Sequence, residues 1–378
     1  MELEIFKEKL NQCLNIVEPL TKKNLNLPIL SNVLIEAEKN FLKISATNLE
    51  TSIIWWILSN IKKEGKVLIP ASFFRSLMGF IKEDKIFISS DENSLTLKNN
   101  DQINQIQGLN PDDFPIIPKM LEEEFVEIDG STLNQGLLQV VNIPSFSQIR
   151  PEISGIYFSF KKDILKVVST DSFRLAEKTI KLNQKNKKDI SFIIPQSTAR
   201  ELISILSVKS DKLRFYFNPN QILFEWIDEE TPYPQIHFSS RLIEGDYPSY
   251  QEIIPKKYTS QIIINKEDFL NQIKKAGLFS GKVSEIKISI ISKENKIRIF
   301  SQSADIGKNE SFLPVKIKEK GGELEEVSFN YKFLIDGLNN IKSSEVIFSL
   351  SEKEGPATLA PVGDESYVYV LMPIKSLQ

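Results

Sequence analysis

The sequence contains very few of the residues that metal sites, disulfides and nucleophilic catalysis use. Its 378 residues include one cysteine, Cys13, and one histidine, His237. A single cysteine excludes an intrachain disulfide framework and is compatible with a reducing compartment. One cysteine and one histidine also exclude a zinc site of the Cys/His type within a single chain. We therefore expect no metal and no other cofactor.

Long apolar segments and a surplus of positive charge are missing too. The longest apolar run, Ile53–Leu58, is far shorter than the roughly 20 residues that a membrane span needs, and Met1–Glu8 has no apolar stretch of the secretory type. Lys and Arg total 47 and Asp and Glu total 50, which gives a net charge of −3. Bulk positive charge therefore does not hold this chain to nucleic acid. We expect a cytoplasmic protein without membrane contacts.

Sequence motifs for nucleotide binding and hydrolysis are absent. The chain has no P-loop, no GxGxxG at a strand–helix junction and no GxSxG elbow. His237 lies in an alternating segment, which favours a half-exposed strand residue over a general base. Asp112, Asp113 and Asp171 could form an acid/base pair or a hard-metal site. All three follow turn or strand-end positions where aspartate usually bonds local backbone. We expect a protein that is not an enzyme, and a carboxylate-dependent hydrolase is the alternative.

A strand–helix segment occurs three times in the chain. The middle copy, 192–206, is an apolar strand, then Pro195, then Ser197 as the expected N-cap of an amphipathic helix. The other copies are 67–81 and 327–341. They recur at roughly 130 residues, which is the size of a domain rather than of a solenoid repeat. The chain therefore contains three copies of one folding unit.

Each copy is preceded by an opening helix and by alternating strands. The apolar stripes expected for the opening helices are Phe6, Leu10, Cys13, Leu14 and Val17; Leu133, Leu137, Leu138 and Val141; and Phe269, Ile273, Ala276 and Leu278. Two helices among many strands per unit predict an α+β fold of antiparallel sheets with helices on one face. Turn-rich segments at 110–115 and 245–250 close the first two units. The predicted domains are 1–122, 123–252 and 253–378.

Basic residues recur on the expected helices and nearby loops. If the repeated units turn their helices toward one surface, these charges could follow phosphates without reading bases. Ordinary solvated helix faces are the alternative. The residues are Lys7, Lys9, Arg75, Lys82, Arg200, Lys266, Lys274, Lys275, Lys332 and Lys342 on helices, and Lys22, Lys23, Lys209 and Lys212 in loops.

Six motifs follow one another from near the first strand to the C-terminus. They are Leu27–Asn32, Ala46–Glu50, Asp112–Pro115, Ser169–Ala176, Glu244–Tyr250 and Tyr369–Ile374. Together they resemble the bacterial sliding-clamp family, the β subunits of the DNA polymerase III holoenzyme. The resemblance implies three DNA-clamp domains of similar fold. It also implies a head-to-tail homodimer that closes into a ring, with helices lining the hole and sheets outside.

The resemblance implies a processivity factor rather than a catalyst. Such a ring encircles double-stranded DNA independently of sequence and tethers the replicative DNA polymerase. A hydrophobic cleft between the second and third domains receives peptides from the polymerase, the clamp loader, repair polymerases and mismatch-repair or ligase proteins. Weak phosphate contacts suit a ring that must slide, and a net charge of −3 fits that. A repeat scaffold that binds peptides but no DNA is a further alternative.

Site residues are carried over from the family motif by motif. The cleft would consist of Ile153, Thr170, Ser172, Phe173, Arg174 and Leu175 from the second domain, Pro248 and Ile253 from the link, and Pro356, Val370, Met372, Pro373 and Ile374 from the third domain. Arg174 would offer fixed donors, and a terminal strand buried in the core is the alternative for Met372–Ile374. The DNA contacts would be Lys22, Lys23, Asn24, Gln148, Arg150 and Arg200, whereas Gln196 stands where a basic residue is common. Ring closure would pair Leu278 and Phe279 with Ile103 and Ile106.

Overall fold

The computed structural model describes residues 1–21, 27–98, 102–120, 124–184, 189–227, 234–319, 326–351 and 354–374. The chain divides into two compact units, each of which is described by itself. Unit 1 is Met1–Asn134, Leu182–Asn186 and Ser197–Ile243, and unit 2 is Gln135–Lys181, Lys187–Gln196 and Glu244–Gln378. The boundary between them runs through the middle repeat, and the three domain ranges given above stay predictions.

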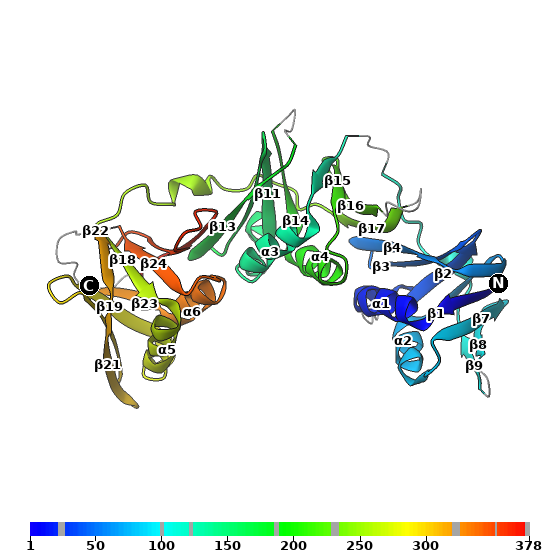
Figure 1. Ribbon diagram of the computed structural model, residues 1–378, viewed down its shortest axis with the longest axis horizontal. Helices are drawn as coiled ribbons and strands as arrows, with labels where there is room; N and C mark the ends of the chain where they lie inside the picture. The colour runs from blue at the N-terminus through cyan, green and yellow to red at the C-terminus, as the bar shows by residue number, and fades with distance from the viewer. Residues whose placement is uncertain are drawn as a thin grey trace. The chain divides into compact units, whose positions relative to one another are not determined.

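Unit 1 contains two antiparallel sheets (Figure 1). The larger has the order β10 (Val126–Ile128), β15 (Leu213–Phe217), β16 (Gln221–Ile227), β17 (Pro234–Arg241), β4 (Thr51–Leu58), β3 (Phe41–Thr47), β2 (Asn32–Glu38) and β6 (Gly65–Pro70). The smaller has the order β5 (Asn60–Lys63), β1 (Glu2–Phe6), β7 (Lys85–Asp91), β8 (Ser94–Lys98) and β9 (Ile103–Gln107). Helices α1 (Lys7–Val17) and α2 (Ala71–Phe80) pack against each other.

Unit 2 repeats this arrangement with different strands (Figure 1). Its larger sheet has the order β14 (Ile190–Pro195), β11 (Gly155–Lys161), β12 (Ile164–Thr170), β13 (Arg174–Lys181), β26 (Tyr367–Leu371), β25 (Ala357–Pro361), β24 (Glu345–Leu350), β18 (Ser260–Asn265) and β22 (Lys316–Glu319). The smaller consists of β21 (Gly307–Pro314), β20 (Lys296–Ser303), β19 (Glu285–Ile291) and β23 (Val327–Asn330). Helices α5 (Lys266–Gly277) and α6 (Tyr331–Asn339) pack together. Helix α3 (Gly130–Val140) and helix α4 (Gln196–Val208) each cross the unit boundary in sequence.

Strands far apart in the sequence share the two large sheets. In unit 1, β17 pairs with β4, and Ile236 lies opposite Trp55. In unit 2, β13 pairs with β26, and Leu175 lies opposite Val370. Each large sheet therefore continues from one predicted domain into the next, and backbone hydrogen bonds cross the predicted domain boundary.

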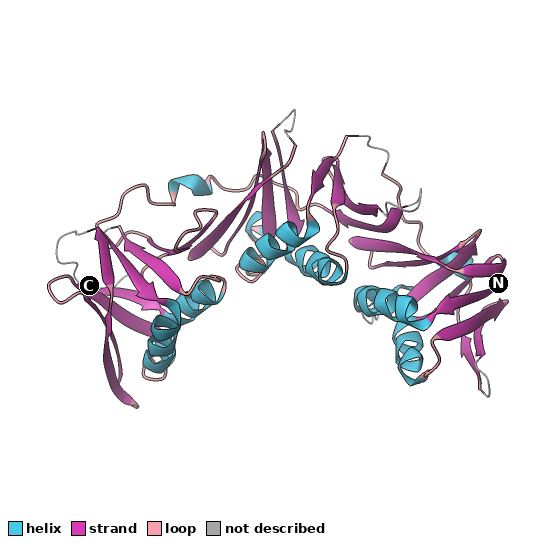
Figure 2. Cartoon of the chain, viewed as in Figure 1, coloured by secondary structure: helices cyan, strands magenta, loops and turns pink. Residues whose placement is uncertain are grey.

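Helices cover one face of the sheets in each unit, which confirms the predicted α+β fold (Figure 2). The stripe of α1 is mostly correct, since Leu10, Cys13, Leu14 and Val17 are fully buried. Phe6 is exposed because it ends β1 and precedes the helix.

Three further details of the helix predictions are wrong. Leu138 is exposed on α3, and Leu278 is exposed because α5 ends at Gly277. Helix α4 begins at Gln196, so Ser197 lies inside its first turn and is not the N-cap. The apolar periodicity thus located the helices but placed some residues at their ends incorrectly.

A repeated hydrogen-bond pattern links the two helices of the first and third copies. The Lys7 backbone N–H donates to Asp84 O, and the Lys266 N–H donates to Ser344 O, both at 2.8 Å. The Lys7 ammonium donates to Ile81 O, just after α2, and the Lys266 ammonium donates to Ile341 O, just after α6, at 2.9 Å. Both lysines therefore bond to backbone carbonyls near a helix C-terminus, where a cation is favourable, and they are not free phosphate contacts.

Helix α3 begins at a cap formed by Asp129. Its Oδ1 accepts hydrogen bonds from Ser131 Oγ at 2.6 Å, Thr132 Oγ1 at 2.7 Å and the Thr132 N–H at 2.8 Å. The hydroxyls of Ser131 and Thr132 hold the pKa of the Asp129 carboxyl below its usual value of 3.8. The ionised carboxylate therefore stabilises the folded chain.

We expect Asp129→Ala to lower the free energy of unfolding by about 1 kcal/mol, the usual value of an N-cap. Because the folded pKa is depressed, this contribution is present above the unfolded pKa of about 3.9. It disappears as the pH falls through the lower folded pKa. Urea unfolding from pH 7 into acid measures it, with Asp163→Ala in the β11–β12 turn, away from any helix start, as the control. A difference between variant and parent that does not change with pH would contradict the cap assignment.

Candidate functional site

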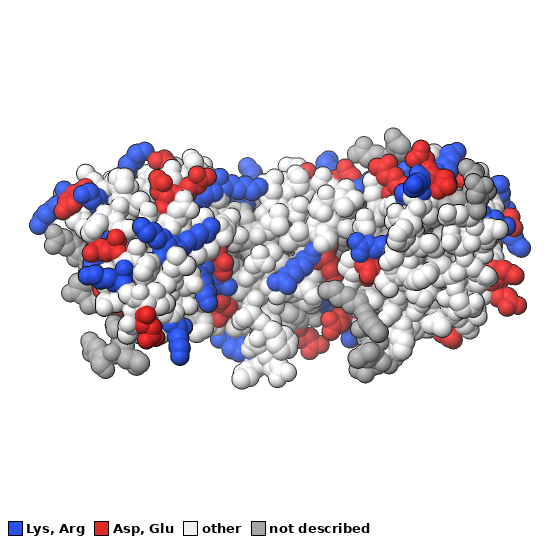
Figure 3. Space-filling model, turned by 90° about the horizontal axis from the view of Figure 1, so that it is seen from below, with Lys and Arg blue, Asp and Glu red and all other residues white. Residues whose placement is uncertain are grey.

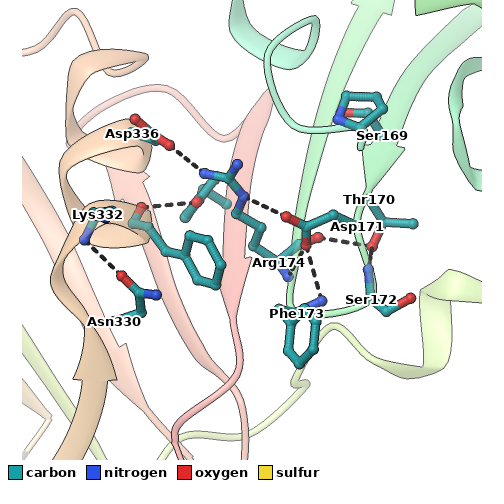
Figure 4. Close-up of polar contacts among 12 residues, drawn as sticks. Ser169, Thr170, Asp171, Ser172, Phe173, Arg174, Asn330, Lys332 and Asp336 are labelled. Carbon is teal, nitrogen blue, oxygen red and sulfur yellow. Dashed lines mark hydrogen bonds and ion pairs between the residues drawn. The ribbon is translucent and has the colours of Figure 1, made fainter. Parts of the chain in front are cut away.

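The turn before β13 carries a cluster of polar contacts (Figure 4). Asp171 Oδ1 accepts hydrogen bonds from the N–H groups of Phe173 at 3.0 Å and Arg174 at 2.9 Å. Asp171 Oδ2 accepts from Arg174 Nε at 2.8 Å. Arg174 Nη1 donates to the Asp336 carboxylate of α6, and its guanidinium lies 4.5 Å from the ring centroid of Phe333. One arginine thus connects β13 to α6.

The charge of Arg174 is fixed by these neighbours. Burial alone lowers the pKa of the guanidinium, but Tyr369, Asp336 and Asp171 raise it, and the net pKa lies above the usual value. The Arg174 side chain is 11% exposed. Arg174 Nε and Nη1 are bonded within the chain and hold Asp171 and Asp336 in place. The expectation that Arg174 also offers donors to a ligand stays a prediction.

Two other residues of the motif shape the same turn. Thr170 Oγ1 donates to Arg174 O at 2.8 Å and accepts from the Ser172 N–H at 3.2 Å. Ser172 has a φ of 76°, in the left-handed region. The turn therefore presents Phe173, whose side chain is 63% exposed.

The C-terminal segment lies beside this turn. The Met372 N–H donates to Phe173 O, and the Ile374 N–H donates to Ser328 O, both at 2.8 Å. The side chains of Met372, Pro373 and Ile374 are only partly buried. The alternative of a fully buried terminal strand applies to β26, which ends at Leu371, and not to Met372–Ile374.

The residues predicted to form the cleft, apart from Arg174, divide into a buried and an accessible group. Leu175 and Val370 pack with Val168 and Tyr250 in one core cluster. Ile153 and Thr170 are buried as well, so these four candidates support the surface from beneath. The accessible candidates are Ser172, Phe173, Pro248, Ile253, Pro356, Met372, Pro373 and Ile374.

Sequence reasoning missed two residues of this cluster, Phe333 and Asp336. Both lie on α6, the helix of the third repeated copy. The repeated strand–helix pattern predicts this helix, but nothing in its sequence indicates that it packs against the turn at Arg174. The contact depends on the pairing of β13 with β26, which only the tertiary structure gives.

The structure describes three of the six predicted DNA contacts. Lys22, Lys23 and Asn24 lie outside the described residues. Gln148 and Arg150 are exposed, and Arg150 Nε is 3.2 Å from Glu152 Oε1. Arg200 is exposed on α4.

Gln196 has a different role from the basic residue expected at its position. Its Nε2 donates to the carbonyls of Val141 at 2.7 Å and Pro144 at 3.2 Å. These bonds fix the start of the loop that leads to Gln148 and Arg150. Gln196 therefore supports this loop through backbone contacts.

Basic side chains remain exposed on the helices of unit 2. Lys274, Lys275 and Lys332 are exposed on α5 and α6. In Figure 3, several Lys and Arg side chains are visible over the part of the chain that carries these two helices, with some Asp and Glu among them. In unit 1, by contrast, Arg75 pairs with Glu18 at 2.8 Å and is less available.

The residues predicted for ring closure divide sharply by exposure. Leu278 is 71% exposed and Ile103 is 72% exposed, whereas Ile106 is 3% exposed. Ile106 lies opposite Leu95, also buried, inside unit 1. It supports β9 from within and does not offer side-chain surface, so its place among the direct contacts is corrected. Phe279 is half-buried.

Two of the three carboxylates of the hydrolase alternative are paired with basic side chains. Asp171 bonds Arg174, and Asp112 pairs with Lys66 beside the short helix Pro111–Asp113. His237 Nε2 lies 2.8 Å from Glu225 Oε2 in the sheet of unit 1. In the part of the chain that the structure describes, no three His, Cys, Asp or Glu residues are grouped to hold a metal ion. None of the described helices combines the length and hydropathy of a membrane span.

Repeated pairs of helices packed on antiparallel sheets are the fold of the DNA-clamp class. Models of the DNA polymerase III beta subunit match the chain in three parts: the N-terminal domain at residues 1–118, the central domain at 127–249 and the C-terminal domain at 251–375. The chain therefore belongs to the DNA polymerase III beta subunit family, and it is a sliding-clamp processivity factor of that polymerase.

Individual relatives match this chain over nearly its whole length. The beta sliding clamp of Staphylococcus aureus is 27% identical over 99% of this chain and 98% of its own, and that of Synechococcus elongatus is 22% identical over 99% of each. The sliding clamp of Bacillus subtilis has a TM-score of 0.91 at 24% identity over 100% of both chains. A sliding clamp of Pseudomonas aeruginosa solved with griselimycin has a TM-score of 0.91 at 22% identity over 100% of both chains.

Proposed function

We propose that two copies of this chain form a head-to-tail ring that encircles double-stranded DNA independently of sequence. The single observation that carries this proposal is the family match over three consecutive domains. Exposed Leu278 and Ile103, on elements of the third and first repeats, are the apolar surfaces that ring closure would bury. Exposed Arg200, Lys274 and Lys275 supply weak phosphate contacts of the kind that lets a ring slide.

The surface around Phe173, Ile253, Met372 and Pro373 is the proposed peptide-binding cleft. Methionine and proline side chains suit an adaptable apolar surface, and the turn at Asp171 is held rigid by its hydrogen bonds. A rigid rim lowers the entropy lost when a peptide is ordered. The proposed occupants are segments of the replicative polymerase, the clamp loader, repair polymerases, and mismatch-repair or ligase proteins.

The role is topological and non-catalytic. Asp171 and Asp112 are engaged with Arg174 and Lys66, so they are not poised as acid and base. We propose that the protein acts in the cytoplasm, where replication takes place, without a cofactor.

A topological link to DNA has a specific signature. After loading onto nicked circular DNA, the protein should stay bound through gel filtration, and linearising the DNA should release it because a ring slides off free ends. Retention is measured on both forms at the same salt concentration. Equal retention on circular and linear DNA would overturn the ring and would favour ordinary charge-mediated binding. No binding to either form, with peptides still bound, would favour a peptide scaffold.

A further inference from the structure

The polar cluster at Arg174 carries a net negative charge although an arginine lies at its centre. Asp171 and Asp336 each contribute one negative charge, and both bond the single guanidinium of Arg174. The sum is one negative charge at the turn that presents Phe173. Both carboxylates bond the same side chain, Asp171 through Arg174 Nε and Asp336 through Arg174 Nη1.

Solvent reaches the three groups unequally. The side chain of Asp171 is 9% exposed and that of Arg174 is 11% exposed, whereas that of Asp336 is 47% exposed. The positive charge is therefore enclosed, and the accessible charge is the carboxylate of Asp336 on α6. Lys332, one turn earlier on α6, has its ammonium 6.0 Å from the ring centroid of Tyr331. Among the described residues, it makes no ion pair with Asp336.

Apolar surface adjoins this carboxylate. The exposed ring of Phe173 lies 6.5 Å from that of Phe333 between centroids, at an interplanar angle of 28°. The guanidinium group of Arg174 lies over the ring of Phe333. Phe173 and Asp336 are both drawn around Arg174 in Figure 4, so an exposed aromatic ring and a partly exposed carboxylate belong to the same cluster.

We propose that this end of the cleft selects partner peptides by charge: an apolar side chain packs on Phe173, and Asp336 favours a basic residue beside it and disfavours an acidic one. The proposal rests on the peptide-binding function proposed above. It adds to that function a specificity residue, Asp336, and a class of preferred partner segment, apolar and locally basic. Arg174 acts as a positioning residue that holds Asp336 by the ion pair.

The test uses a short fluorescein-labelled segment of the cell's replicative polymerase, selected by tiling that sequence against the intact protein. Each residue next to an apolar residue is replaced in turn by Lys, Gln and Glu, and Kd is measured by fluorescence anisotropy at low and high salt. At one position, the Lys peptide should bind about fivefold tighter than the Glu peptide, the scale of a partly exposed charge pair. Added salt should reduce this ratio.

Asp336→Asn should abolish the preference, and Asp305→Asn, an exposed carboxylate in the β20–β21 turn, should keep it. Phe173→Ala should weaken the Lys and Glu peptides by the same factor. Equal binding of the Lys and Glu peptides at every position, or the same ratio in Asp336→Asn, would overturn the charge selection and leave peptide binding standing. No binding by any tiled segment would overturn the proposed cleft itself.

Discussion

Removing residues 372–378 should abolish binding of the polymerase segment, with a loss of at least about 100-fold in affinity, the scale of an interface hot spot. The deletion begins just after β26, so the pairing of β13 with β26 stays intact. It takes away the partly buried side chains of Met372, Pro373 and Ile374 and the hydrogen bond from Met372 to Phe173. Anisotropy with the labelled segment measures the loss.

The control for this deletion is the assembly of the protein. Native mass spectrometry and thermal unfolding should give the same dimer and nearly the same melting temperature, because the proposed dimer contacts lie elsewhere. Phe173→Ala provides a second, single-residue variant on the same surface and should also weaken binding. Unchanged affinity in both variants would show that the peptide binds at another surface.

Leu278→Asp should convert the ring into monomers and remove retention on nicked circular DNA. Leu278 follows α5 directly and is exposed, so an aspartate there is tolerated by the monomer. Lys275 and Lys274 lie three and four residues earlier, respectively, and their charges favour an acidic neighbour. In a closed interface, the same carboxylate would lose its water and face apolar surface of the partner copy, which costs several kcal/mol, so the dimer should weaken by at least about 100-fold.

A matched control for this substitution exists on another helix. Leu138 is also exposed, on α3, and is not part of the proposed interface. Leu138→Asp should leave the dimer unchanged in sedimentation equilibrium. If Leu278→Asp also stays dimeric, the assignment of Leu278 to the interface is wrong, whatever the behaviour of Leu138→Asp.

Local patterns predicted the elements of this fold well. Helices α2 and α6 lie within the repeated strand–helix segments, as predicted, although they begin directly after Pro70 and Asn330 rather than after a cap two residues later. The role of Asp171 in its turn could also be predicted from the sequence, since its side chain bonds only residues within three positions. These features depend on interactions between residues that are close in the sequence, so the sequence alone is enough to predict them.

Features that depend on distant parts of the chain were not predictable in the same way. Phe333 and Asp336 join the site only because β26 brings α6 next to β13. The burial of Ile106, by contrast, could have been predicted from the sequence. Residues three apart in a strand point to opposite faces, so in a sheet with one covered face only one of Ile103 and Ile106 is exposed, and in the structure it is Ile103.

The pairing of β4 with β17 has a consequence for synthesis of the chain. β4 has the sequence Thr-Ser-Ile-Ile-Trp-Trp-Ile-Leu, and one of its two neighbours, β17, ends only at Arg241. At the usual 5–20 residues per second, the ribosome needs roughly 10 to 40 seconds to make the intervening chain. Throughout that time β4 is an open, apolar sheet edge, the kind of surface on which unrelated strands dock and aggregate. The nascent chain is therefore most prone to aggregation during this interval. Chaperones that bind nascent chains would protect it most then, and so would a lower concentration of other unfolded chains.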